Sequence, residues 1–323
     1  MRPAFSVLFL TTLIGAGQGL FLALFTQHSY ALLGQLPMQD AEFYGYGSAL
    51  ALVLLTVGLL ASFFHLGHPE RAWRAIMQWR TSWLSREVIV LPAFMGIVFM
   101  YGAAHLLHWK PVLATLPSGI AVDTTVLLGC IGTLLAFALY ICTAMIYACL
   151  RMMREWHSPL TVFNFILMGG GSGFLLAAAY AAIAAPSQAA FFAAWAFIIT
   201  LLALFSRAAA LWRNARLRPV TTLQSATGIK HPRIVQKSQG AMGGSYNTHE
   251  FFHGKSPAFI RAIKPAFLVL AFSVPLLMLA VGHSAAAILL PAFVVQYMGL
   301  LAERWYFFAE VNHPQNIYYQ TLG

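Results

Sequence analysis

The residues of this chain that could do chemistry gather in a short polar segment between two apolar runs. The segment places His65, His68, Glu70 and Arg71 close together, and Glu87 follows at the start of the next apolar run. Imidazole titrates near neutral pH, so a histidine can donate or accept a proton at a carbonyl oxygen. A carboxylate partway into a membrane can relay protons, and a guanidinium can hold an anionic oxygen. These residue types predict a polar pocket that binds a ligand with a carbonyl group and transfers protons to or from it.

The elements that must position this pocket are apolar helices. Hydrophobic residues make up 60% of the 323 residues, and charged residues make up only 9%. A helix that crosses a bilayer core needs about 20 apolar residues, whereas a transmembrane β-barrel shows alternating segments of about ten. The chain is therefore predicted to be all-α, one transmembrane helical domain over residues 1–323. The eight predicted spans are 5–30, 46–64, 87–107, 122–149, 160–184, 189–211, 265–282 and 284–303.

The basic residues predict the orientation of these spans. All but one of the 19 lysine and arginine residues fall on the side of the predicted bundle that holds the N-terminus, and the exception is Lys110. Positively charged loops stay in the cytoplasm. Both termini, and the segment with His65 and Glu87, are therefore predicted to face the cytoplasm. The net charge of +10 is then a signal of topology, and no nucleic-acid-binding motif accompanies it.

The long segment 212–264 is predicted to be a basic cytoplasmic loop between the sixth and seventh spans. It is rich in glycine, serine, histidine and basic residues, and it has too few apolar residues to build a core. A connection of this length is either functional or a flexible linker. Its aromatic residues and histidines, among them His249 and His253, favour folding against a partner, and a solvated connector is the alternative.

A quinone is the ligand that the polar segment fits. A quinone needs hydrogen-bond donors for two carbonyl oxygens, a path for protons and an apolar slot for its tail. We predict that His65, Glu87 and Arg71 bind a quinone, either ubiquinone or menaquinone. The tryptophans nearby also suit an interfacial belt, and Arg71 could instead pair with Glu70, Glu87 or a partner protein. Further predicted lining residues are Phe64, His68, Trp83, Ser85 and Arg304.

Metal and haem sites are not expected on this chain. Its three cysteines, in one apolar block, form no CxxC pair of the kind that a metal site favours. A b-type haem needs two axial imidazoles at similar depth on facing helices. Only His28 and His105 could be argued as such a pair, and both are expected near the edge of the membrane.

A family resemblance rests on the residues of the polar segment. The pattern His65-Leu-Gly-x-Pro69-x-Arg71-Ala72, followed by Ser82-x-Leu84-Ser85-x-Glu87, resembles the signature of the DmsC family. This family comprises the membrane anchor subunits of dimethyl sulfoxide reductase and related complex iron–sulfur molybdoenzymes. The resemblance implies eight spans, no haem, and a role in quinone binding for His65 and Glu87. It also implies two partners, a ferredoxin-like iron–sulfur subunit and a catalytic molybdopterin subunit, which hold those cofactors.

Within this family, two stretches resemble the anchors of cytoplasmic sulfite dehydrogenases. They are Asn247-Thr-His-Glu-Phe-Phe-His-Gly254 and Glu303-Arg-Trp-Tyr-Phe-Phe-Ala-Glu-Val-Asn-His-Pro-Gln-Asn316. The resemblance implies a multi-pass anchor of the bacterial cytoplasmic (inner) membrane that passes electrons from the iron–sulfur subunit to a quinone on the cytoplasmic side. The residues expected to dock that partner are Arg74, Arg80, Arg86, Arg151, Arg154, His249 and His253.

Two alternative functions remain open at this point. A quinone site works in both directions, so the chain could oxidise quinol and feed a reductase of the dimethyl sulfoxide type. The non-enzyme alternative is a membrane carrier. Carriers typically have broken helices and charged residues near the middle of the membrane, and the centres of the predicted spans hold almost no charge.

Overall fold

The computed structural model describes residues 5–64, 66–115, 117, 119, 121–218, 222–234, 256–282 and 284–311. Within these ranges the protein is a helical bundle in which eight helices are long and apolar enough to cross a membrane. The prediction of an all-α fold with eight spans is thereby confirmed. The spans are α1 Phe5–Leu32, α2 Ala41–Phe63, α3 Trp83–Leu106, α4 Thr124–Ala148, α5 Pro159–Ala184, α6 Ala189–Asn214, the α8–α9 segment Pro257–Val281, and α10 Ala286–Ala309.

Shorter elements lie between and within the spans. A 3₁₀ helix follows α2, two short antiparallel strands join α3 to α4, and the seventh span contains a π-helical turn. The hydropathy pattern that predicts the spans carries no signal for the strands or the turn. The short elements are η1 Pro69–Gln78, β1 Val112–Thr115, β2 Ala121–Asp123, η2 Pro186–Gln188, α7 Leu223–Thr227, α8 Pro257–Leu268, η4 Val269–Ser273 and α9 Val274–Val281.

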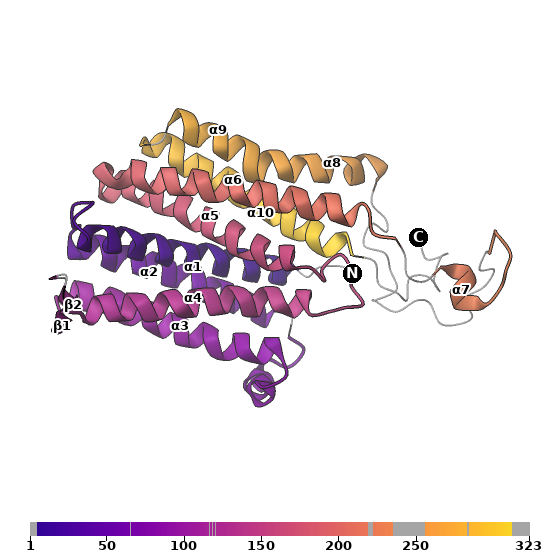
Figure 1. The fold of residues 1–323 in the computed structure, drawn as a ribbon, viewed down its shortest axis with the longest axis horizontal. Helices are drawn as coiled ribbons and strands as arrows, with labels where there is room; N and C mark the ends of the chain where they lie inside the picture. The colour runs from indigo at the N-terminus through magenta and orange to yellow at the C-terminus, as the bar shows by residue number, and fades with distance from the viewer. Residues whose placement is uncertain are drawn as a thin grey trace.

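Helices α1 and α5 form the centre of the bundle. In their most apolar stretches 72% of the residues are buried, against 28–39% in the other spans. Glycines allow the two helices to approach closely, because a Cβ on Gly173 of α5 would clash with the backbone of Gly19 of α1. Small residues at helix contacts are typical of membrane bundles, where close packing drives association. Figure 1 shows α3 and α4 on one side of this centre, and α8, α9 and α10 on the other.

The two ends of the bundle carry different connections. Helix α1 begins and α10 ends at the same end of the molecule, which also carries η1 and α7 (Figure 1). The strands β1 and β2 lie at the opposite end, next to Lys110. An even number of spans returns the chain to its starting end. The basic connections between α2 and α3 and between α4 and α5 therefore lie at the end with η1.

Two helix boundaries differ from the prediction in a way that matters for the site. Helix α3 begins about one turn earlier than predicted. The cause is Ser82, whose hydroxyl accepts a hydrogen bond of 3.4 Å from the Ser85 amide and caps the helix. Helix α10 continues more than one turn past its predicted end. Glu87 and Arg304, which were expected at the ends of spans, therefore lie inside helices.

Helices α2 and α8 also begin earlier than predicted. Their N-cap residues are Asp40 and Ser256, and the Ser256 hydroxyl accepts a hydrogen bond of 3.2 Å from the Phe259 amide. Hydropathy reports where apolar residues begin, whereas caps decide where a helix begins. The earlier start of α8 therefore follows from a polar cap that a hydropathy window leaves out, whereas the Asp40 side chain makes no cap hydrogen bond at the start of α2.

Candidate functional site

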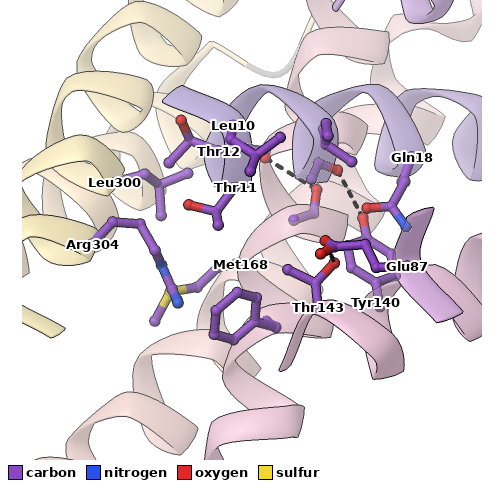
Figure 2. A pocket seen from close by; sticks show the side chains of 15 residues that line it. Leu10, Thr11, Thr12, Gln18, Glu87, Tyr140, Thr143, Met168, Leu300 and Arg304 are labelled. Atoms are coloured by element: carbon purple, nitrogen blue, oxygen red, sulfur yellow. Dashed lines mark hydrogen bonds between the residues drawn. The ribbon is translucent and has the colours of Figure 1, made fainter. Parts of the chain in front are cut away.

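A small cavity lies inside the bundle, between α1, α3, α4, α5 and α10. Its volume is about 30 Å³, which is room for roughly one or two water molecules. Figure 2 shows Glu87 and Arg304 on opposite sides of it. The cavity thus brings together two of the predicted site residues from distant parts of the chain. Its polar lining residues are Thr11, Thr12, Gln18, Glu87, Tyr140, Thr143, Ser172 and Arg304.

Glu87 is the carboxylate of this cavity. It lies near the start of α3 and is only 8% exposed. The Thr143 hydroxyl of α4 donates a hydrogen bond of 2.5 Å to Glu87 Oε1. Within the described part of the chain, no basic side chain forms an ion pair with Glu87. A buried carboxylate without a cationic partner is costly, and such a residue inside a membrane helix is typically functional.

Arg304 lines the cavity from α10. Its Nε lies 2.9 Å from Glu303 Oε2, and its Nη2 donates to the Met168 sulfur at 3.0 Å. The guanidinium carbon lies 4.1 Å from the centre of the Phe165 ring, which is a cation–π contact. The remaining nitrogen, Nη1, is buried and has no hydrogen-bond partner among the described residues. The Phe307 ring lies on the same guanidinium at 5.2 Å, so Arg304 is held by four contacts while its Nη1 stays unpaired.

A buried network of charges surrounds Arg304. Arg207 of α6 lies on the other side of Glu303, with its Nε 2.8 Å from Glu303 Oε1. Arg207 Nη2 also lies 3.7 Å from Glu310 Oε2, so two cations balance two carboxylates. Burial raises the pKa of the Glu310 carboxyl, and the charge of Arg207 opposes this rise. These contacts are ion pairs by distance, without the alignment of hydrogen bonds. Removing one member would leave an uncompensated buried charge.

Arg207 and Glu303 are buried neighbours of the cavity residue Arg304 that the sequence patterns did not identify, and neither lines the cavity. Arg207 was counted only toward topology, and Glu303 only toward the family resemblance. Both residues lie within membrane-spanning helices, since α6 extends to Asn214 and α10 to Ala309. A charged residue inside a span is the signal by which they could have been identified. Charged residues within membrane helices almost always face the bundle interior and pair with one another.

The predicted pocket residues of the first polar segment lie on the outside of the bundle where the structure describes them. Phe64 is 87% exposed at the end of α2. His68 and Arg71 are exposed on and next to η1, and both contact Glu70, at 3.0 and 3.6 Å. None of these residues lines the cavity. His65 lies outside the described residues, so its predicted role in quinone binding stays a prediction.

The start of α3 is tied to the connection before it. Arg86 donates to the carbonyl oxygens of Trp79 and Arg80, at 2.9 and 2.8 Å. Its guanidinium carbon lies 4.2 Å from the centre of the Trp83 ring. Ser85 is buried next to this cap but does not line the cavity. Arg86, which was predicted to dock a partner, therefore also fixes the local backbone.

The other predicted docking residues that the structure describes are exposed arginines. Arg74 and Arg80 each lie over the ring of the tryptophan that precedes them in the chain. Arg151 and Arg154 are exposed between α4 and α5. All four lie at the end of the bundle that carries η1, where a partner could reach them. Two docking candidates lie outside the described residues, His249 and His253.

The histidines weighed as haem ligands contact each other near the opposite end of the bundle. The rings of His28 and His105 meet edge to face with centres 5.3 Å apart. His28 Nδ1 lies 3.0 Å from the Tyr101 hydroxyl, and His105 stacks on Tyr44. Within the described ranges, no group of three or more His, Cys, Asp or Glu residues could hold a metal ion. The expectation of no haem and no metal on this chain stays a prediction.

The fold and the cavity define a class of protein, a polytopic helical membrane protein with a buried glutamate and arginine at one internal site. The family profile described as DMSO reductase anchor subunit (DmsC) matches residues 2–306. The chain is also 54% identical over 325 aligned positions to the C subunit of sulfite dehydrogenase from Allochromatium vinosum, and the alignment covers all of both chains. The chain therefore belongs to the DmsC family of membrane anchor subunits.

Proposed function

We propose that this chain is the quinone-reactive anchor of a sulfite-oxidising molybdoenzyme complex in the bacterial cytoplasmic membrane. Membership of the DmsC family supports the anchor role, and the name of the Allochromatium vinosum relative supports sulfite as the substrate of the complex. The observation that carries the quinone reactivity is the buried carboxylate of Glu87, which lines one cavity with Arg304 inside the spans (Figure 2).

The proposed reaction balances over two electrons. In the molybdopterin subunit, sulfite and water become sulfate, two protons and two electrons. The electrons pass through the clusters of a ferredoxin-like iron–sulfur subunit that docks on this anchor. Two electrons and two protons then convert a membrane quinone, ubiquinone or menaquinone, to its quinol. The molybdopterin and the clusters belong to the partner subunits, so this chain contributes quinone binding, proton delivery and attachment to the bilayer.

Glu87 is the proton carrier in this proposal. A carboxyl group near the start of a span can take a proton from the aqueous side and pass it to a quinone oxygen. The Thr143 hydroxyl, at 2.5 Å from Glu87 Oε1, orients the group. His65 donates a hydrogen bond to the same quinone oxygen. Arg71, which lies 3.6 Å from Glu70, holds the connection before α3.

The polar groups that line the cavity fit a quinone. The volume of the cavity, however, has to increase before the quinone ring can enter. A carboxyl group that donates when it is protonated and a buried guanidinium with an unused donor can each hydrogen-bond one of the two quinone carbonyl oxygens. The cavity of about 30 Å³ is far smaller than the roughly 300 Å³ of a small ligand pocket. Leu10, Ile14 and Leu300 form part of its apolar lining. We propose that these aliphatic side chains move when the ring enters, while Met168 keeps its contact with Arg304.

The quinone site and the docking face share the cytoplasmic side in this proposal. The positive-inside rule assigns the end with η1 to the cytoplasm. The start of α3 that carries Glu87 and the exposed arginines, Arg74 among them, all belong to that end. An iron–sulfur subunit docked on these arginines is then close to the quinone, and neither electrons nor protons need to cross the membrane.

The test uses the assembled complex purified from membranes. Sulfite oxidation is measured with decyl-ubiquinone and, separately, with an artificial dye that takes electrons from the soluble subunits. Glu87→Gln is expected to lower the quinone-dependent rate by about 100-fold, because it removes the proton carrier, and to leave the dye-dependent rate unchanged. The matched control is Glu42→Gln, an exposed carboxylate in the first turn of α2 at the opposite end. An unchanged quinone-dependent rate in Glu87→Gln contradicts the proposal.

The second candidate is an anchor that oxidises quinol and feeds a reductase. It is favoured by the description of the matching family as DMSO reductase anchor subunit. The two candidates differ in the direction of electron flow, so the same complex is supplied with decyl-ubiquinol and dimethyl sulfoxide. Rapid quinol oxidation without sulfite-driven quinone reduction would support the second candidate over the first.

A further inference from the structure

We infer that Arg304 binds the second oxygen of the quinone, donating from Nη1 to the carbonyl opposite the one that Glu87 protonates, and that Arg207 positions it through Glu303. The inference rests on the proposed function and extends it. Arg304 lies across the cavity from Glu87, and attachment to the bilayer alone does not require the buried ion network around it.

The first observation is the unused donor of Arg304. The side chain is buried, and Nη1 has no hydrogen-bond partner among the described residues. An unsatisfied buried donor on a charged group is costly, so such groups are almost always paired. Arg304 also lines the cavity (Figure 2). A neutral or partly negative oxygen in the cavity is the partner that this donor lacks.

The second observation is that the other donors of Arg304 are fixed. Nε lies 2.9 Å from Glu303, Nη2 donates to Met168, and the guanidinium carbon lies 4.1 Å from the centre of the Phe165 ring. A guanidinium carries its donors in a rigid planar fork. Fixing two of its nitrogens therefore also fixes the direction of the third. Nη1 is thus a preset, unpaired donor on a residue that lines the cavity, and fixed donors of this kind stabilise charge that develops on a substrate oxygen.

The third observation is the place of Arg207. One carboxylate oxygen of Glu303 lies 2.9 Å from Arg304 Nε, and the other lies 2.8 Å from Arg207 Nε. Because Arg207 shares the charge of Glu303, that charge does not fully neutralise Arg304, and Arg304 keeps positive potential toward the cavity. Arg207 does not line the cavity. It is therefore a positioning residue, which acts on the quinone only through Glu303 and Arg304.

Arg304 and Glu87, on the two sides of the cavity, have different chemical roles in this inference. A guanidinium does not give up its proton in a protein, so Arg304 can bind an oxygen and stabilise its negative charge but cannot protonate it. Glu87 can do so. We therefore expect loss of Arg304 to weaken quinone binding, and loss of Glu87 to slow turnover at saturating quinone.

The experiment measures KM and kcat for decyl-ubiquinone in the assembled complex, with the dye-dependent rate as the measure of assembly. Arg304→Lys keeps the charge balance of the network but lacks the fork. This variant is expected to raise KM by about 10- to 100-fold, because one hydrogen bond to a charged group is lost. Arg207→Gln is expected to raise KM by about tenfold, and Arg207→Lys to restore part of this loss. The matched control is Arg216→Gln, an exposed arginine over Trp212 at the end of α6, which should leave KM unchanged.

The outcomes separate this inference from the proposed function. A wild-type KM in Arg304→Lys, together with the loss of turnover in Glu87→Gln, overturns the role of Arg304 and leaves the anchor proposal standing. Normal kinetics in both variants overturns both. If a variant fails to assemble, the inference can still be tested on the unaltered complex by photolabelling with an azido-quinone. The label is expected on peptides of α5 and α10. Labelling confined to residues 66–83 overturns the inference.

Discussion

Glu87 of α3 and Arg304 of α10 line one buried cavity from opposite sides, although one belongs to the third span and the other to the eighth (Figure 2). One is a carboxylate with a hydroxyl donor, and the other is a guanidinium with an unused nitrogen. In the proposed function, Glu87 carries protons to a quinone in this cavity, and Arg304 binds the second carbonyl oxygen.

His65 is expected to be needed for the quinone reaction. His65→Ala should lower quinone-dependent turnover by about 100-fold, because it removes a proton-donating group from a carbonyl oxygen. The dye-dependent rate should not change. The control is His108→Asn, an exposed histidine at the opposite end of the bundle whose positive φ asparagine tolerates. Wild-type quinone kinetics in His65→Ala would falsify the role assigned to this residue.

Glu303 is expected to be the most sensitive member of the ion network. Glu303→Gln leaves the buried guanidinium groups of Arg207 and Arg304 without their shared carboxylate. Breaking a buried pair in this way costs about 3–5 kcal/mol, so the complex should lose activity at a clearly lower temperature. The double variant Glu303→Gln with Arg207→Gln removes one charge of each sign and should recover part of the loss. Equal thermal stability of the single variant and the wild type would show that the network is not a stabilising one.

Gly173 is expected to tolerate no side chain. In Gly173→Ala the new Cβ would meet the backbone of Gly19, so α1 and α5 would have to separate. Such overpacking costs about 1–3 kcal/mol, and the yield of folded anchor in the membrane should fall. The matched control is Gly170→Ala on the same helix, where the nearest atom is Ile199 Cγ2 at 3.5 Å, an ordinary contact. Similar yields for both variants would contradict this packing.

The orientation of the bundle can be tested with single cysteines. Thr115→Cys lies in the exposed strand β1, and Ser225→Cys lies in α7 at the opposite end. The positive-inside rule predicts that a membrane-impermeant maleimide labels the first in intact cells and the second only after the membrane is opened. The background needs its native cysteines replaced, because Cys130 and Cys149 are exposed. The reverse labelling pattern would invert the proposed topology.

The sequence by itself determined the spans and the candidate carboxylate. Hydropathy is a local property, and each span has to bury its own backbone polar groups in lipid, so eight apolar runs became eight helices. Glu87 was identifiable because a carboxylate near the start of an apolar run is costly wherever the helix packs. Helix boundaries were less accurate, since caps such as Ser82 and Ser256 act within a few residues that an apolar average ignores.

The tertiary structure alone decided which polar residues meet. The contact between Arg207, Glu303 and Arg304 joins α6 to α10, and the cavity joins α10 to α3, because helices far apart in the chain pack around α1 and α5. Nothing local in the sequence states which helices are neighbours. The same packing left His68 and Arg71 exposed beside Glu70, although their spacing had suggested one pocket with Glu87. Spacing along the chain predicts proximity only within one element or turn, and the site lies between five helices.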